Sequence, residues 1–138
     1  DDMQKISVFK NNKKTRILGV TILTSLDKKQ TLKYYKEKKV EILVKKFANY
    51  AKKNNLSGLV CSPLEINIVR KEVGKKMILV VPGIRTEKNS LNKKDDQKRT
   101  LTPKEAINLG ADFLVIGRPI IEANNPLETI KKINHSIQ

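Results

Sequence analysis

The segment Phe113–Pro119 holds the residues of this chain that are best suited to chemistry. An apolar stretch there ends in Gly117-Arg118, and Pro119 suits the first position of a helix. Gly117 lets an anion approach the backbone closely and can donate its N–H to a phosphate oxygen. The Arg118 guanidinium is a planar fork that matches phosphate geometry. The pattern predicts a strand that leads into a phosphate site, and the alternative is a plain turn with a surface arginine.

Strands and helices alternate along the chain around this segment. Strands are expected at 16–23, 58–61, 77–81 and 113–116, and helices at 28–53, 63–73, 103–110 and 119–136, the last one interrupted at 124–126. Continuous apolar strands of this kind are typically buried on both faces, in a parallel sheet covered by helices. Four such units are half of an eight-fold barrel. Because an open half-barrel has two unpaired strand edges, we expect a fragment or one half of a pair.

Helix ends and one long connection carry recognisable signals. Ser62 and Thr102 are expected helix caps, each followed by a proline, and Glu105 completes a capping box with Thr102. Gly74 suits the position just after a helix. The segment 86–99 is too polar for the core and too long for an ordinary connection, so it is predicted to be a mobile functional loop.

The expected strand ends share a limited chemistry. Ligands of parallel β/α proteins bind beyond the carboxyl ends of the strands. Those ends are Thr24-Ser25, Cys61-Ser62, Pro82–Arg85 and Gly117-Arg118. They provide hydroxyls, two arginines and glycines, without a carboxylate or a histidine. The set indicates a rim that binds an anionic ligand, and it lacks the groups of a complete catalytic apparatus.

The composition fits one domain, residues 1–138, with a net charge of +15. Specific nucleic-acid binding is not expected, because the positive charge is mostly lysine, is spread along the chain and is accompanied by three Tyr, three Phe and no Trp. Nonspecific adhesion to polyanions at low salt is expected.

Targeting and metal-binding signals are weak. There is no apolar run long enough to cross a bilayer, and the first residues are polar and acidic, so we expect a cytoplasmic protein without membrane association. The single Cys61 rules out an internal disulfide framework and a Cys-rich zinc site, and it is expected to be a core thiol. His135 is expected at the surface, and no metal-ligand constellation is present in the sequence.

Five segments resemble, in order, the C-terminal half of bacterial orotidine 5′-phosphate decarboxylases. They are 20–25 (VTILTS), 58–62 (GLVCS), 81–85 (VPGIR), 96–99 (DQKR) with Thr102-Pro103, and 115–119 (VIGRP). The resemblance runs from about Arg16 to His135. It implies a TIM (β/α)8 barrel of which this chain supplies about the last four βα units. It also implies a homodimer that converts orotidine 5′-phosphate to UMP and CO2 in de novo pyrimidine synthesis, without a cofactor.

The resemblance also implies roles for individual residues. Thr24 would hydrogen-bond the pyrimidine side of the ligand, and its alternative is a turn hydroxyl. Arg85 would belong to the ligand-closing loop, and its alternative is a surface charge. Gln97 would reach the phosphate from that loop, which is a few residues longer than is common in the family. Gly117 and Arg118 would hold the phosphate.

The groups that perform the decarboxylation are absent from this sequence. The reaction leaves negative charge on a pyrimidine carbon, which requires a nearby ammonium and carboxylates that orient it. The family supplies these groups in an Asp-x-Lys-x-x-Asp motif. The nearest match begins at Asp27 and Lys29 and has Leu32 in place of the second Asp. We therefore assign no catalytic residue and predict that the chain alone is inactive.

Two other functions remain open from the sequence. One is a different phosphate-binding barrel enzyme of the same superfamily, acting on a sugar phosphate. The other is a noncatalytic basic half-barrel that binds polyanions.

Overall fold

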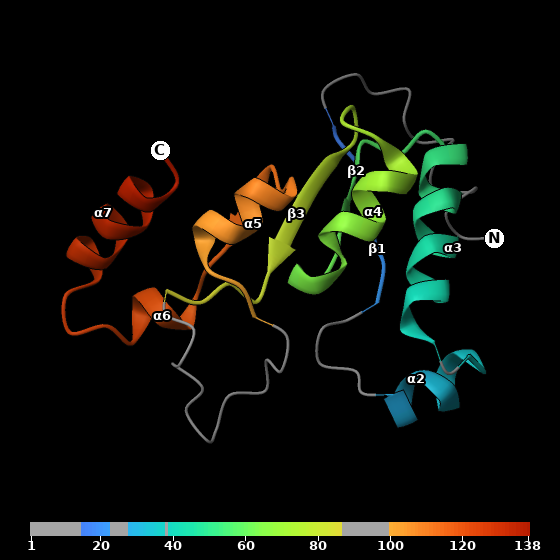
Figure 1. Ribbon diagram of the computed structural model, residues 1–138, viewed down its shortest axis with the longest axis horizontal. Coiled ribbons are helices and arrows are strands. Elements are labelled where there is room, and N and C mark those ends of the chain that lie inside the picture. Colours follow the sequence, from blue (N-terminus) through green and yellow to red (C-terminus); the bar gives the residue numbers. More distant parts are fainter. Residues whose placement is uncertain (1–14, 23–27, 38, 87–99) are drawn as a thin grey trace.

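The structure, a computed structural model, describes residues 15–22, 28–37, 39–86 and 100–138. Its four parallel strands form one sheet in the order β1-β2-β3-β4 (Figure 1). The strands are β1 (Leu18–Val20), β2 (Gly58–Val60), β3 (Ile78–Pro82) and β4 (Phe113–Val115). The helices are α2 (Lys28–Tyr35), α3 (Val40–Lys53), the 3₁₀ helix η2 (Pro63–Glu65), α4 (Ile66–Val73), α5 (Pro103–Leu109), α6 (Arg118–Ile121) and α7 (Pro126–Ser136). The alternation confirms the predicted half of an α/β barrel. None of the described helices is long and apolar enough to cross a membrane.

The register of the sheet brings the strand ends together. Leu18 lies opposite Gly58, Gly58 opposite Ile78, and Pro82 opposite Val115. Gly58 is required here, because a side chain at this position would come within 2.8 Å of both the Ile78 Cβ atom and the Leu18 side chain. Because all four strands run parallel, their carboxyl ends lie at the same edge of the sheet, and the candidate ligand residues follow there.

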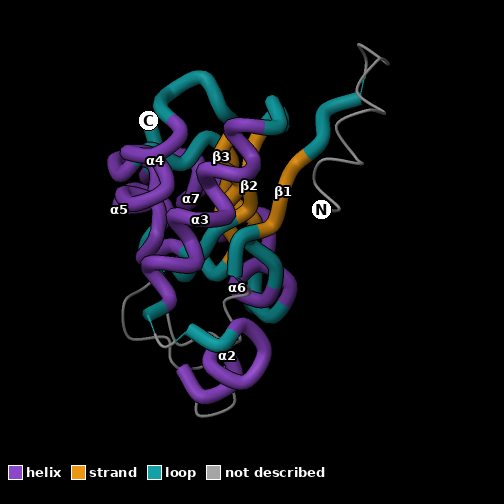
Figure 2. The backbone as a smooth tube through the Cα atoms, turned by 90° about the vertical axis from the view of Figure 1, so that its right-hand side faces the viewer, coloured by secondary structure: helices purple, strands orange, loops and turns teal. Residues whose placement is uncertain are grey.

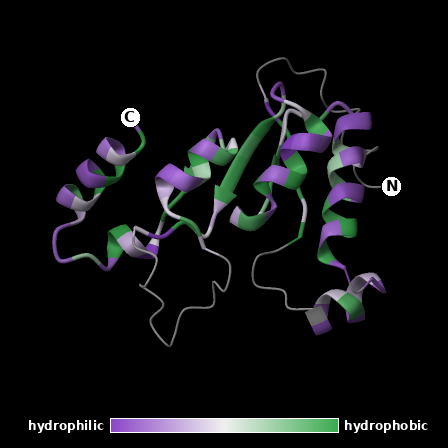
Figure 3. Cartoon of the chain, in the orientation of Figure 1, coloured by the Kyte–Doolittle hydropathy of each residue, from purple (hydrophilic) through white to green (hydrophobic). Residues whose placement is uncertain are grey.

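One face of the sheet is covered by helices. Leu59, Leu79 and Val81 point to this face and are fully buried. They belong to one core with side chains of α3 and α4, which pack against each other beside the strands (Figure 2). Figure 3 shows the apolar colouring of β3 and of the helix sides nearest to it. This face provides the hydrophobic stabilisation of the fold.

The other face of the sheet is open, and here the prediction of strands buried on both faces is wrong. The side chains of Leu18, Val20, Phe113 and Val115 are 38%, 49%, 56% and 51% exposed. Val80, in the middle of the sheet, is only partly buried. The described part of the chain contains no second layer for this face, since its helices α3 and α4 pack on the opposite one.

Several predicted helix ends are confirmed. The Thr102 hydroxyl accepts from the Glu105 N–H at 3.4 Å, and the Glu105 carboxylate accepts from the Thr102 N–H at 3.0 Å. Gly74 ends α4 with φ 74°, in the left-handed region that favours glycine. The predicted interruption at 124–126 separates α6 from α7, and the Asn125 side chain caps α7 by accepting from the Glu128 N–H at 3.2 Å.

The predicted helix 28–53 is in fact two helices. The break follows Tyr35, and Lys36 has φ 55° in the left-handed region. Leu32, Tyr35 and Tyr50, which a continuous helix would place on one apolar face with Val40 and Val44, are 39%, 40% and 37% exposed. Because the break redirects the chain, α2 does not continue the buried face of α3. That face consists of Val40, Leu43, Val44, Ala48 and Ala51.

The second helical segment begins with a 3₁₀ turn, η2, in which Leu64 is 57% exposed. Ser62 is the N-cap residue of η2, as predicted, although its hydroxyl makes no hydrogen bond among the described residues. The Glu65 carboxylate instead caps the turn by accepting from the Ser62 N–H at 3.4 Å.

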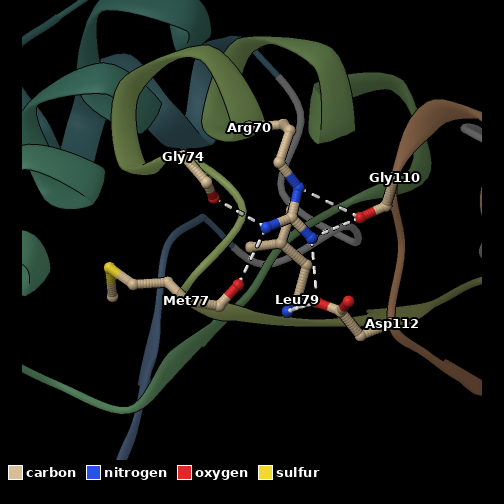
Figure 4. A network of polar contacts seen from close by, with 6 residues as sticks. All are labelled: Arg70, Gly74, Met77, Leu79, Gly110 and Asp112. Atoms are coloured by element: carbon tan, nitrogen blue, oxygen red, sulfur yellow. Dashed lines mark hydrogen bonds and ion pairs between the residues drawn. The ribbon is translucent and has the colours of Figure 1, made fainter.

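A polar network fixes the amino ends of β3 and β4. The Arg70 guanidinium donates to the carbonyls of Gly74 and Met77, each at 2.8 Å, and to the Gly110 carbonyl (Figure 4). It also donates to the Asp112 carboxylate at 2.8 Å. One residue of α4 thus connects the turns that precede both strands.

Candidate functional site

The candidate site lies at the carboxyl ends of β3 and β4. These strands are paired up to Pro82 and Val115, so the segments that follow them, Gly83–Arg85 and Ile116–Arg118, leave the sheet side by side. The structure therefore brings three of the predicted site residues, Arg85, Gly117 and Arg118, to one edge of two adjacent strands.

Gly117 and Arg118 form the exposed part of this site. Both residues are exposed, and no atom outside the immediate chain lies within 4 Å of where a Cβ of Gly117 would be. The open space is what an anion needs to approach the backbone. The Gly117 carbonyl accepts from the Ile120 and Ile121 N–H groups at 2.9 and 3.1 Å, which starts α6 directly at the site. Arg118, the first residue of α6, is therefore held on a short helix beside the glycine.

Arg85 has a different environment. It is 7% exposed, so the alternative of a surface charge is wrong. Its N–H donates to the Leu101 carbonyl at 3.0 Å, and its Nη1 donates to the Ile84 carbonyl at 3.0 Å. Ile84 and Leu101 also form a parallel β-bridge. Arg85 therefore helps to join the two ends of the segment 86–100, at the base of the predicted ligand-closing loop.

Two predicted site residues cannot be placed. Thr24 lies outside the described residues, as do Gln97 and most of the predicted loop 86–99. Thr21, three positions before Thr24, is described and is buried. Its hydroxyl and its N–H both bind the Val60 carbonyl, at 3.1 and 3.0 Å, which continues the β1–β2 pairing towards the site.

The segment that follows β2 is buried, and it includes a carboxylate, that of Glu65, which the sequence analysis missed. Glu65 is 3% exposed and caps the turn after the strand. Its signal in the sequence was the spacing Ser62-x-x-Glu65, which is typical of a capping box. Cys61 is buried beside it, and this burial, together with the Glu65 charge, raises the pKa of the thiol to about 12. Cys61 is thus confirmed as a core thiol, and it is a poor nucleophile.

The chemistry of the described residues around this edge is limited. No group of three His, Cys, Asp or Glu among them could hold a metal ion. Lys29, in the nearest match to the missing motif, is an exposed residue of α2, and Leu32 is 39% exposed; Asp27 is not described. His135 is exposed, as predicted. At the strand end the described residues present an accessible backbone at Gly117 and the exposed residue Arg118 beside it.

Comparison with known protein families shows which family this chain belongs to. The sequence profile of the "Orotidine 5'-phosphate decarboxylase / HUMPS family" matches residues 3–133, which is nearly the whole chain. The chain belongs to this family. Its relatives include the orotidine 5′-phosphate decarboxylase of Wolbachia pipientis subsp. Culex pipiens, 46% identical over 127 residues, and that of Coxiella burnetii, 42% identical over 125 residues.

The solved structures of the family have the same architecture. The orotidine 5′-phosphate decarboxylase of Lactobacillus acidophilus superposes with a TM-score of 0.70 and 29% identity, over 89% of this chain and 49% of that one. An enzyme from Sulfolobus solfataricus, at 19% identity and a TM-score of 0.66, shares the fold over 98% of this chain and 54% of that one.

The matches also define how much of the family's fold is present. The two relatives match over 91% of this chain, but over only 54% and 52% of their own lengths. The chain thus spans about half the length of the curated relatives it matches. This agrees with a sheet of four parallel strands that is open on one face.

Proposed function

We propose that this chain is the phosphate-binding half of an orotidine 5′-phosphate decarboxylase. The observation that carries the proposal is the position of Gly117 and Arg118, exposed at the carboxyl end of β4 in a chain of this family. Carboxyl strand ends are where β/α barrels bind their ligands, and the phosphate site of such barrels commonly lies at the last strands. The relatives in Wolbachia and Coxiella carry the decarboxylase name.

In the complete enzyme each half would have a distinct task. Gly117 and Arg118 would hold the phosphate of orotidine 5′-phosphate, while Gln97 would add a contact from the loop and Thr24 one to the pyrimidine. Arg85 would support the base of that loop. The Asp and Lys groups that stabilise the carbanion and protonate the pyrimidine carbon would come from the half of the relatives' length that this sequence does not span. CO2 leaves, a proton takes its place, and UMP forms without a cofactor. We further propose that the complete enzyme is a cytoplasmic homodimer.

A titration of the chain with UMP, followed by NMR, tests the phosphate role. Arg118→Ala is expected to weaken UMP binding by tenfold or more, because a charged hydrogen bond to phosphate contributes about 1.5–3 kcal/mol. Arg16→Ala is the matched control, since Arg16 is also exposed but precedes β1 and so lies at the opposite end of the sheet. It is expected to leave UMP binding unchanged.

Two competing ligands define the outcomes that would contradict the proposal. Equal binding of ribose 5-phosphate and UMP would favour an enzyme that acts on a sugar phosphate. Stronger binding of RNA than of UMP, with a steep loss of affinity as salt rises, would favour a polyanion-binding protein. Preference for UMP that persists at physiological salt supports the decarboxylase half.

A further inference from the structure

The lysines along α3 follow a fixed spacing. Lysine pairs occur at 38–39, 45–46 and 52–53, so each pair comes seven residues after the one before. Seven residues are close to two turns of an α-helix, and side chains with this spacing therefore lie on one side of it. Successive pairs are about 10 Å apart along the helix axis. The described members of the pairs, here called the lysine face, are Lys39, Lys45, Lys46, Lys52 and Lys53.

The lysine face lies on the side of α3 that points away from the sheet. All five of its lysines are exposed. The opposite side of the helix is apolar and buried, and it consists of Val40, Leu43, Val44, Ala48 and Ala51. The helix itself contains one carboxylate, that of Glu41, so most of the positive charge is not balanced along α3.

The positive charge is concentrated in this part of the chain. Residues 28–53 contain ten lysines and two glutamates, which is a net charge of +8 out of +15 for the whole chain. Residues 118–136, by contrast, contain three basic and two acidic residues, and Lys132 there is paired with Glu128 at 2.7 Å. A local excess of one sign creates a potential that attracts an extended ligand of the opposite sign.

Helix stability does not explain the whole lysine face. Lys39 is the N-cap residue of α3, and its side chain makes no capping hydrogen bond. An ammonium group cannot accept from the first N–H groups of a helix, and positive charge at this end opposes the helix dipole. A residue that opposes local stability at an exposed position suggests a role in binding.

An aromatic ring lies beside the lysines. The Lys46 Nζ atom is 5.9 Å from the centre of the Tyr50 ring, which is 37% exposed and comes one turn before Lys53. Phosphate contacts from lysines, combined with stacking of a base on an aromatic ring, are typical of surfaces that bind single strands. An anionic membrane fits this surface less well, because the apolar side of α3 is buried in the core and cannot insert into lipid.

We propose that the lysine face of α3 binds a single-stranded polynucleotide, with backbone phosphates along the lysines and one base stacked on Tyr50. Recognition is independent of base sequence, because the lysines contact only phosphates. In Figure 1, α3 lies on the opposite side of the molecule from α6, which begins at Arg118. The lysine face is therefore a second binding surface, separate from the proposed ligand site, and it does not depend on that proposal.

The test is a titration of a fluorescent oligo(A) strand of about 12 nucleotides with the 138-residue chain at low salt, followed by anisotropy. Adenine is used because a uridine strand could also enter the proposed UMP site. A double variant with Lys46→Gln and Lys53→Gln is expected to weaken binding by tenfold or more. It should also reduce the slope of log affinity against log salt by about 1.4, because two phosphate contacts are lost.

The matched control removes the same charge elsewhere. Lys104→Gln with Lys131→Gln changes exposed lysines of α5 and α7, and it is expected to keep the affinity and the salt slope. Tyr50→Leu should weaken binding by threefold or more, whereas Tyr50→Phe, which keeps the ring, should bind as the wild type does. At physiological salt, oligo(A) is expected to bind more weakly than UMP.

Three results would overturn the proposal. Equal weakening by the two lysine variants would mean that only the total charge matters. Equally tight binding of a duplex of the same length would exclude stacking of a base on Tyr50. Loss of oligo(A) binding in Arg118→Ala would place the strand at the ligand site instead. Circular dichroism establishes that the variants keep the wild-type helix content. UMP binding by the α3 variants is expected to stay unchanged, which separates failure here from failure of the UMP titration.

Discussion

The two faces of the sheet carry similar side chains but have different surroundings. On the covered face, Leu59, Leu79 and Val81 are fully buried against α3 and α4. On the open face, Val20 and Val115 are about half exposed although they are as apolar. Among the residues that the structure describes, helices complete the first face and leave the second open. The difference shows that hydropathy indicates which residues are suited to burial. Whether they are buried depends on what packs against them.

The largest expected difference is in stability. Leu79→Ala should lower the free energy of unfolding by about 3 kcal/mol, because it opens a cavity in a fully buried site. Val115→Ala, on the open face, should change it by less than about 1 kcal/mol. Urea denaturation of both variants measures the contrast. Equal losses would mean that the open face is buried in solution by the chain itself or by a second copy.

A smaller effect is expected at the amino ends of the strands. Arg70→Ala should cost about 2 kcal/mol, because it leaves the carbonyls of Gly74, Met77 and Gly110 without this donor. Arg70→Lys should restore only part of the loss, since an ammonium cannot span the same set of partners. Urea denaturation gives the stability, and hydrogen exchange of β4 shows whether the loss is local. Wild-type exchange in Arg70→Ala would contradict this role.

The smallest effect on stability concerns Cys61 on the covered side. Its folded pKa of about 12 lies above the value of 9.0 for a free thiol, so the folded state holds the proton more tightly. The stability that this provides is present below pH 9 and declines as the pH rises towards 12. Iodoacetamide should therefore label Cys61 slowly in the folded chain at pH 8. In a Val115→Cys variant the new thiol should react much faster, and equal rates would contradict the comparison of the faces.

Sequence reasoning succeeded where the determinants are local. The cap at Thr102, the interruption at 124–126 and the glycine at Gly74 depend on residues within one turn, and the parallel sheet follows from the alternation of strands and helices. It failed at Lys36, whose left-handed backbone conformation divides the helix, because no glycine or proline at this position indicates a break.

Exposure of the open face was equally inaccessible to sequence reasoning. Phe113 and Val115 have the hydropathy of core residues, and nothing in their own segment shows that the described part of the chain leaves them exposed. Arg85 is buried where its N–H donates to the carbonyl of Leu101, a residue distant in sequence. The sequence around Arg85 therefore left two interpretations open, a residue of the ligand-closing loop and a surface charge. The roles of Thr24 and Gln97 remain predictions from the family resemblance.

The most direct test of the whole account uses this chain in a complex with the segment of the Wolbachia pipientis decarboxylase that the match does not cover. Decarboxylation of orotidine 5′-phosphate by this complex is followed by the absorbance of the pyrimidine. The account predicts turnover by the complex and none by the 138-residue chain alone. It also predicts that Arg118→Ala raises the Michaelis constant of the complex by tenfold or more while the complex stays intact. Turnover by the chain alone, or a stable complex that neither binds UMP nor turns over the substrate, would contradict it.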